Sequence, residues 1–320
     1  MSLIEKAAQR LDQLKQASAA PGDEPVQTVM PHTPLEPKAK EAVAPTVNDL
    51  SKSSEVPLSV PQTQSVAMSR TVHIDLERLA TKGLVTPEQP RSSIAEEFRV
   101  IKRPLLRNAT DTGPARIDNA NLIMVTSAMP GEGKTFSAIN LAISMAMELD
   151  YTVLLVDADV SRPSVFRQLA LPPERGLMDV LAGEVTDLSD VLLRTNIEKL
   201  SILPAGMPHQ RATELLASEN MNRLLKQIAT RYSDRIVVFD SPPLLVTTES
   251  RVLATHMGQV VLVVESERTT HASVKQALAT IESCPIKLMM LNKSRHGGPG
   301  SYYGYGYGYG YGEKPREHAA

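Results

Sequence analysis

The stretch VTSAMPGEGKTFSAIN, residues 125–140, constrains the fold more than any other part of the chain. An apolar run with the composition of a buried strand leads into a glycine-bearing turn, and a helical pattern follows the turn. Gly131 and Gly133 let the backbone approach a ligand closely, and the unpaired N–H groups at a helix N-terminus favour anions. Lys134 and Thr135 stand where a phosphate-binding loop (P-loop) places a lysine near the β- and γ-phosphates and a hydroxyl on Mg²⁺. The sequence therefore predicts a site for ATP and Mg²⁺.

The predicted nucleotide contacts come from the loop, the first turn of the helix and one distant position. Ala128 is a departure from the general P-loop pattern, which has glycine there. Asn292, at the end of the last strand-like run, is predicted to contact adenine, and a role in a turn is the alternative. The predicted loop contacts are Pro130, Gly131, Glu132, Gly133, Lys134, Thr135 and Phe136.

Short apolar runs rich in β-branched residues alternate with longer helical patterns. The strand-like runs lie at 121–127, 152–159, 200–206, 235–243, 259–266 and 286–292. The helical patterns lie at 92–106, 136–149, 213–232 and 272–283. This alternation predicts an α/β fold of the P-loop NTPase class, with a mostly parallel sheet covered by helices on both faces.

Three aspartates stand at the ends of two predicted strands, where open parallel sheets bind ligands. Asp157 and Asp159 end one strand and Asp240 ends another. A single aspartate at such a place can equally be a helix cap, but the P-loop favours a metal site for the group. Thr135, Asp157 and Asp240 are predicted to hold Mg²⁺ and its waters. Either Asp157 or Asp159 is predicted to accept the proton of an attacking hydroxyl.

The rest of the chain divides into segments of different composition. Residues 1–17 have the spacing of a short amphipathic helix, either a frayed terminus or a docking helix. Residues 18–70 contain many prolines and no aromatic residue, which predicts a disordered tether. The folded domain is predicted at 71–296. Residues 297–320 form a predicted flexible tail, in which glycines separate most of six tyrosines out of the chain's eight.

Composition excludes several classes of function. The formal net charge of −2 argues against a general nucleic-acid binder. Cys284 is the one cysteine, so disulfides within the chain and cysteine-based metal clusters are excluded. The start of the chain has no apolar core of a signal peptide, and no apolar run approaches the roughly 18 residues of a membrane-spanning helix. These features predict a cytoplasmic protein.

The motifs together resemble those of the bacterial tyrosine kinases, P-loop kinases of polysaccharide export that are unrelated to the eukaryotic kinase fold. SAMPGEGKT resembles their Walker A motif, LLVDADVSRP their Walker A′ motif and VVFDSPP their Walker B motif. Ser161 stands where many members have the first basic residue of the A′ motif, which leaves the role of that position open. The start of the chain, the tether and IAEEFRVIKRPLLRNA resemble more closely the tyrosine autokinases of exosortase/PEP-CTERM exopolysaccharide loci. The resemblance covers roughly residues 71–312 and the first helix.

The segment EEFRVIKR resembles the family's helical E-x-x-R-x-x-R oligomerisation motif. Glu96, Arg99 and Lys102 occupy its three positions, and their spacing places them on one face of a helix. Lys102 keeps the charge of the usual arginine but loses its bidentate fork. The resemblance implies a homo-oligomeric ring assembled through these three residues. A solvated charged face is the alternative.

The resemblance also implies a reaction. A kinase of this kind uses ATP to phosphorylate tyrosines in its own C-terminal tail and thereby regulates exopolysaccharide synthesis or export. Its catalytic residues here would be Lys134, Asp157 and Asp159. The implied acceptors are Tyr302, Tyr303, Tyr305, Tyr307, Tyr309 and Tyr311. An integral membrane activator of the export system would hold the kinase at the periphery of the inner membrane.

Three other functions fit parts of the sequence. The leading alternative is an ATPase switch of the ParA/MinD type, which carries a signature lysine four residues before the last glycine of its loop. Met129 stands there, and Ser127–Glu132 contains no lysine. A metal-cluster carrier of the same superfamily would need bridging cysteines, and a structural adaptor would not need an intact set of site residues. For the tail, an adhesive segment of low complexity is the alternative.

Overall fold

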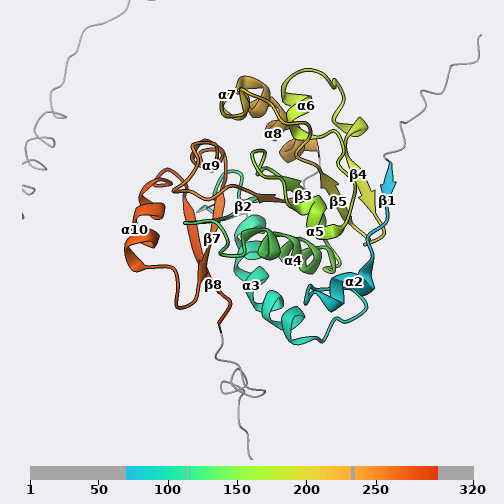
Figure 1. Cartoon of the computed structure of the whole chain (residues 1–320), viewed down its shortest axis with the longest axis vertical. Coiled ribbons are helices and arrows are strands. Elements are labelled where there is room, and N and C mark those ends of the chain that lie inside the picture. The colour runs from blue at the N-terminus through green and yellow to red at the C-terminus, as the bar shows by residue number, and fades with distance from the viewer. Residues whose placement is uncertain (1–69, 112, 115, 232–234, 295–320) are drawn as a thin grey trace, which may run out of the picture. The chain divides into compact units, whose positions relative to one another are not determined.

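The structure is a computed structural model that describes residues 70–294 except 112, 115 and 232–234. Its described part is built around one eight-stranded sheet with the order β1-β4-β5-β3-β6-β2-β7-β8 (Figure 1). Every neighbouring pair of strands is parallel except β4 and β5. The strands are β1 (Thr71–Val72), β2 (Leu122–Ser127), β3 (Thr152–Asp157), β4 (Leu193–Thr195), β5 (Leu200–Leu203), β6 (Arg235–Asp240), β7 (Gln259–Glu265) and β8 (Ile286–Asn292).

Helices cover both faces of this sheet. They are α2 (Leu76–Thr81), α3 (Ser93–Thr110), α4 (Lys134–Ala146), α5 (Val165–Leu169), α6 (Leu177–Leu181), η1 (Leu188–Asp190), α7 (Ala212–Leu216), α8 (Glu219–Arg231), α9 (Glu249–Ala254) and α10 (His271–Ala279). Alternate residues of each inner strand face opposite layers, because side chains in a strand alternate in direction. In β2, Ile123 joins the apolar cluster formed with α2–α5, whereas Leu122 and Met124 join the cluster formed with α6–α10. The predicted α/β fold is therefore confirmed.

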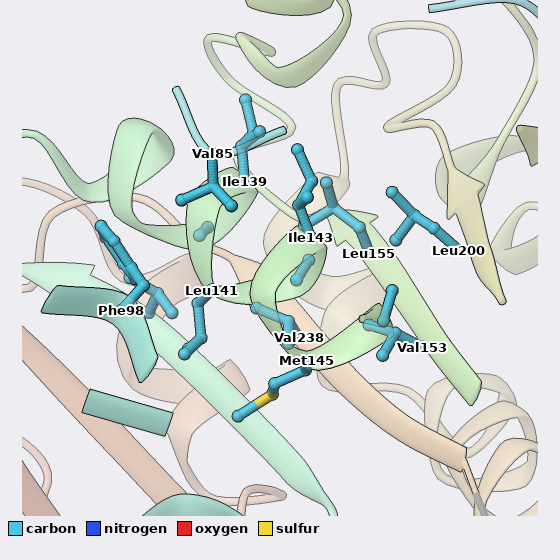
Figure 2. Packing of buried hydrophobic residues seen from close by; sticks show 14 of the residues in the cluster. Val85, Phe98, Ile139, Leu141, Ile143, Met145, Val153, Leu155, Leu200 and Val238 are labelled. Carbon is cyan, nitrogen blue, oxygen red and sulfur yellow. The ribbon is translucent and has the colours of Figure 1, made fainter. Parts of the chain in front are cut away.

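Helix α4, which follows the P-loop, is buried on all sides. Every one of its residues except Phe136 is buried, so it lacks the polar face of a surface helix. Figure 2 shows Ile139, Leu141 and Ile143 of α4 among residues of α3, β3 and the segment before α3. Polar contacts also anchor the helix, because the side-chain oxygen of Asn140 accepts a hydrogen bond from the Val85 N–H at 2.6 Å. This packing fixes the N-terminal end of α4, which carries Lys134 and Thr135.

Several elements differ from the sequence-based expectation. The single helix predicted at 213–232 is two helices, because the Ser218 hydroxyl accepts from the Met221 N–H and caps the start of α8. The sequence shows no clear periodicity at several short elements, so it does not predict them. These are the strands β1 and β4 and the helices α2, α5, α6 and α9. Three predicted segments, 1–17, 18–70 apart from Arg70, and 297–320, lie outside the described residues.

Lys102 does not share an exposed face with the other two residues of the predicted oligomerisation motif. Glu96 and Arg99 form an ion pair on α3 and keep about two fifths of their side-chain surface exposed, 41% and 40%. Lys102 is 4% exposed, donates a hydrogen bond to the Ser144 carbonyl and pairs with Glu148 at 2.8 Å. Burial lowers the pKa of Lys102, and the Glu148 carboxylate opposes that shift. The expectation that Lys102 lies at a surface contact is therefore wrong for the described fold, where it ties α3 to the end of α4.

We expect Lys102→Met to lower the free energy of unfolding by about 2 kcal/mol, because Glu148 then loses its buried partner. Arg103→Met is the matched control, since Arg103 also contacts Glu148, at 3.2 Å, but its side chain is 60% exposed. That control should cost less than about 0.5 kcal/mol. Urea unfolding followed by circular dichroism measures both changes. Equal effects of the two substitutions would contradict the structural role given to Lys102.

Candidate active site

The C-terminal ends of β2, β3 and β6 lie side by side and hold the candidate site. Strand β6 pairs with β2 on one side and with β3 on the other, although the chain visits β6 last of the three. Such a reversal of strand order is where open α/β sheets bind ligands. In the β3–β6 register Asp157 pairs directly with Asp240. Two segments more than eighty residues apart thus bring their carboxylates to the end of the P-loop.

Both glycines of the P-loop adopt backbone conformations that other residues rarely adopt. Gly131 and Gly133 have φ angles of 88° and 97°, in the left-handed region that side-chain-bearing residues rarely adopt. Gly133 also has no room for a side chain, because a Cβ there would stand 2.1 Å from Nδ2 of Asn292. Gly133 is the N-cap of α4, so the loop delivers the chain straight into the helix.

Lys134 forms the central ion pair of the site. Its Nζ lies 2.6 Å from Oδ2 of Asp159 and 3.9 Å from Oδ1 of Asp240. All three residues are buried, and Asp240 has no exposed surface. The second oxygen of Asp159 accepts a hydrogen bond from the Arg162 N–H at 3.1 Å. The structure therefore brings together three of the residues predicted from the motifs.

A hydroxyl pair links the P-loop to the strand ends. The Thr135 hydroxyl donates to Oδ2 of Asp240 at 2.7 Å and lies 2.7 Å from the hydroxyl of Ser164. Ser164 also donates its backbone N–H, together with that of Val165, to Oδ2 of Asp157. Asp157 thus uses one oxygen to cap the start of α5. Its other oxygen stays available to the candidate site, so the two predicted roles of this aspartate do not exclude each other. Sequence reasoning missed Ser164, because only the tertiary fold turns it back toward Thr135.

Asp157 and Asp240 hold their protons unusually tightly in the ligand-free protein. Burial and the neighbouring Asp240 carboxylate raise the pKa of Asp157 to about 7. Burial raises the pKa of Asp240 to about 6, against the opposing effects of Lys134 and Thr135. Burial is the largest cause of both shifts, and a neighbouring carboxylate adds to each pKa, Asp240 to that of Asp157 and Asp159 to that of Asp240.

The residues fit a bound Mg²⁺. Oδ1 of Asp157 and Oδ1 of Asp240 are buried and have no hydrogen-bond partner among the described residues. Mg²⁺ prefers oxygen ligands and usually takes only one or two carboxylates, with phosphate oxygens and waters completing its shell. In the described part of the chain, no group of three or more His, Cys, Asp or Glu residues is arranged as a metal site. Two carboxylates and the Thr135 hydroxyl therefore match a cation shared with a nucleotide.

The remaining predicted contacts lie around the loop. Pro130 is exposed, and Phe136 is half-buried and packs on the apolar cluster under α4. Nδ2 of Asn292 donates to the Glu132 carbonyl at 2.9 Å, so its amide faces the loop backbone. Contact of Asn292 with adenine stays a prediction.

Comparison with known proteins identifies the family. A protein-family model described as an AAA domain matches residues 120–293. The tyrosine-protein kinase YwqD of Bacillus subtilis strain 168 is 32% identical over 229 residues, which are 70% of this chain and 92% of that protein. The chain belongs to the family of bacterial tyrosine kinases.

Two further relatives differ in how much of their own length matches this kinase. The solved kinase domain of the Escherichia coli tyrosine kinase ETK has a TM-score of 0.59 and 26% identity, covering 76% of this chain and 95% of that domain. The succinoglycan biosynthesis transport protein ExoP of Rhizobium meliloti strain 1021 is 31% identical over 223 residues, which are 68% of this chain but 27% of that protein. Within the described residues of this tyrosine kinase, no helix is both long enough and apolar enough to span a bilayer.

The pKa of Asp157 predicts how stability depends on pH without ligand. This pKa rises from an ordinary 3.8 to about 7, so the folded chain binds the proton more tightly than the unfolded chain. The resulting stabilisation is fully present below the unfolded pKa and is lost as pH rises through about 7. We expect the melting temperature of ligand-free Asp157→Asn to fall less than that of wild type between about pH 5 and about pH 8.

The exposed Asp150→Asn is the control for this measurement, and its melting curve should follow that of wild type. Differential scanning calorimetry at several pH values gives the comparison. Parallel pH profiles for wild type and Asp157→Asn would show that Asp157 does not bind its proton in this way.

Proposed function

We propose that this chain is an ATP-dependent protein-tyrosine autokinase that phosphorylates the tyrosines of its own C-terminal tail. The observation that carries the proposal is the convergence of Lys134, Thr135 and three aspartates at one end of the sheet, in a member of the bacterial tyrosine kinases. The sequence of the tail supports it, because six tyrosines, the acceptor residue type, stand in one glycine-rich segment. Regulation of exopolysaccharide synthesis or export is the proposed role.

Lys134 and Asp159 are proposed to act in sequence. Their buried ion pair holds the lysine inside the site before nucleotide arrives. The phosphates of ATP compete for the ammonium group, and Lys134 then stabilises the charge on the transferring phosphoryl group. Loss of its partner leaves the Asp159 carboxylate unneutralised and able to accept a proton. The base is thus released by the binding of the substrate it serves.

The phosphoryl transfer is an in-line substitution. The tyrosine Oη forms a bond to the γ-phosphorus, the bond from that phosphorus to the bridging oxygen breaks, and ADP leaves with that oxygen. The phenolic proton passes to Asp159, since the pKa of free tyrosine, about 10, makes an orienting base useful at neutral pH. Asp157 is less suited, because one oxygen accepts two backbone N–H bonds and the other, which has no hydrogen-bond partner among the described residues, is a proposed Mg²⁺ ligand.

Mg²⁺, when bound, would neutralise part of the phosphate charge. Thr135, Asp157 and Asp240 are the residues proposed to hold it and its waters. Ser164 positions two of them, since its hydroxyl contacts Thr135 and its N–H holds Asp157.

The described chain contacts the P-loop shortly before the predicted tail starts in the sequence. Nζ of Lys293, four residues before the tail, lies 2.7 Å from the Gly131 carbonyl of the P-loop. An extended chain spans about 3.3 Å per residue, so Tyr311 lies within roughly 60 Å of Lys293 along the chain. That length is ample for a neighbouring subunit's site. Glycines separate most of these tyrosines, and glycine adds no side chain that would hinder entry of a tyrosine into a cleft.

The ParA/MinD-type ATPase switch is the competing function. The fold and an AAA domain are compatible with it, but the place of its signature lysine is held by Met129, whose side chain is 45% exposed. The relatives named tyrosine kinase favour the autokinase. A switch of that type would hydrolyse ATP without forming phosphotyrosine.

A membrane partner and a homo-oligomeric ring complete the proposal. ExoP is named a transport protein, and the kinase-like part is about a quarter of that chain. We propose that the present kinase works at the inner membrane through a separate integral membrane protein, and that exposed Glu96 and Arg99 contact a neighbouring copy in a ring. Lys102 is buried and stabilises the position of α3 through its contacts with the Ser144 carbonyl and Glu148.

We expect Lys134→Met to abolish incorporation of labelled phosphate from ATP–Mg²⁺, because the transferring group loses its main cation. Asp159→Asn should slow the reaction at least about 100-fold yet still bind nucleotide, since it removes the proton acceptor while the phosphates of ATP replace Asp159 as the partner of Lys134. Lys275→Met, an exposed change on α10, is the control and should react normally.

Mass spectrometry locates the phosphate, and we expect to find it in the tail of wild type. Phosphate found only on Tyr151 or Tyr232, or normal reaction of folded Lys134→Met, would refute the proposal.

We expect Glu96→Ala with Arg99→Ala to shift an assembled wild type toward monomers, because the change removes the exposed charges of the proposed contact. Light scattering measures the mass. Arg107→Ala, an exposed change on the same helix outside the motif, should leave the mass unchanged. Assemblies of equal mass for wild type and the double variant would remove the Glu96/Arg99 contact from the proposal.

A further inference from the structure

A buried acid inside the P-loop has no part in the mechanism above. Glu132 is 3% exposed and lies between the two loop glycines, where a carboxylate repels the phosphates of a ligand. One of its oxygens accepts from the Met129 N–H at 2.9 Å, and the other accepts from the Thr269 hydroxyl. The acid therefore joins the loop to the turn that follows β7.

That turn is itself well fixed. The Thr269 hydroxyl accepts from the Glu265 N–H at 3.0 Å while it donates to Glu132, and the Thr269 N–H donates to the Glu265 carbonyl at 3.1 Å. The Ser266 N–H donates to the Asn292 carbonyl at 2.9 Å, which joins the turn to the end of β8. Thr269 thus holds Glu132 from a rigid support.

The end of β8 holds the loop from the same side. Nδ2 of Asn292 donates to the Glu132 carbonyl at 2.9 Å, and Nζ of Lys293 donates to the Gly131 carbonyl at 2.7 Å. Lys293 also pairs with Glu265 at 3.1 Å. Two successive carbonyls of the P-loop are therefore bound by side chains from one strand end.

These contacts determine where the loop's N–H groups point. In a trans peptide the C=O and the following N–H point in opposite directions, so a carbonyl held at β8 turns the next N–H away from β8. The Gly131 and Glu132 carbonyls are held in this way, which directs the N–H groups of Glu132 and Gly133 to the other side of the loop. Neither N–H donates to a protein acceptor among the described hydrogen bonds. Unpaired, convergent N–H groups are what a phosphate group binds.

We propose that Thr269, Asn292 and Lys293 are positioning residues, here called the loop clamp, that hold the P-loop with its N–H groups turned toward the nucleotide phosphates. The inference rests on the proposed binding of ATP at this loop and adds residues that do not touch the phosphates. In this role Asn292 supports the loop backbone and does not read the base. In the sequence, Lys293 lies four residues before the predicted tail at 297–320.

The first test removes one hydroxyl. Thr269→Val leaves a Glu132 oxygen without its donor, and we expect it to weaken binding of Mg–ADP by the full-length protein roughly fivefold in titration calorimetry. Thr269→Ser keeps the hydroxyl and should restore binding to within about twofold. Thr280→Val removes a hydroxyl at the other end of α10, whose partner among the described residues is the Ala277 carbonyl, and this variant should bind as wild type does.

The second test separates loop support from base recognition. Asn292→Ala should weaken Mg–ADP and Mg–tripolyphosphate, which has no base, by the same factor. Loss of ADP affinity alone would show that Asn292 contacts adenine and would overturn its place in the clamp. Lys293→Met should likewise weaken both ligands, and it serves as a further probe if Asn292→Ala does not fold.

Two substitutions of Glu132 separate the anchor from the charge. Glu132→Gln keeps groups able to bond Met129 and Thr269 but removes the negative charge, so we expect tighter binding of tripolyphosphate. Glu132→Ala removes the anchor as well, and we expect weaker binding. Tighter binding by both variants would show that Glu132 acts only through its charge and would overturn the clamp.

Two outcomes separate the clamp from the proposed function. If wild type binds neither ligand, the proposed function and the clamp are both overturned. If wild type binds and all clamp variants bind equally well, the clamp alone is overturned.

Discussion

The structure depends on how one buried ammonium group and three buried carboxylates share a small volume. Lys134 neutralises Asp159 directly and lies 3.9 Å from Asp240, whereas Asp157, beside Asp240, has no ion pair among the described residues. The raised pKa values of Asp157 and Asp240, about 7 and about 6, favour bound protons at these carboxylates at mildly acidic pH. A divalent cation would take the place of those protons. Binding of metal and nucleotide at this site should therefore release protons and strengthen as pH rises through that range.

The strand order makes this concentration of charge possible. After β3 the chain moves outward to β5 and β4 and then returns to place β6 between β3 and β2. Because these three strands are parallel, their carboxyl ends meet at one edge, and the polar side chains that follow them converge. The two apolar clusters keep the strands in place from both faces. Because α4 is buried, its N-terminus has a fixed position at that edge. The P-loop before it is therefore restricted in conformation.

Sequence reasoning succeeded where the signal is local. The P-loop, the six longer strands and the aspartates at strand ends each follow from a few consecutive residues, and the structure brings Lys134, Thr135, Asp157, Asp159 and Asp240 together. It failed where the role of a residue depends on a distant partner. Lys102 looks like a surface charge in its helix, but Glu148 and the Ser144 carbonyl draw it inward. Ser164 and Thr269 are ordinary hydroxyl residues in the sequence and acquire partners 29 and 137 positions away only in the fold.

The same charge distribution gives a direction to the proposed tail chemistry. An unmodified tyrosine side chain is neutral at pH 7, so it can approach a site lined by carboxylates without electrostatic penalty. After transfer the side chain carries about −1.5 to −2 charges, and the site still holds its aspartates and the ADP phosphates. The product is then repelled by the surroundings that accepted the substrate, which favours its departure and entry of the next tyrosine. Full modification of six tyrosines would add roughly nine to twelve negative charges to a chain whose formal net charge is −2. Tails in that state would repel one another and the sites of neighbouring copies, so an assembly that unmodified tails hold together should loosen as the reaction proceeds.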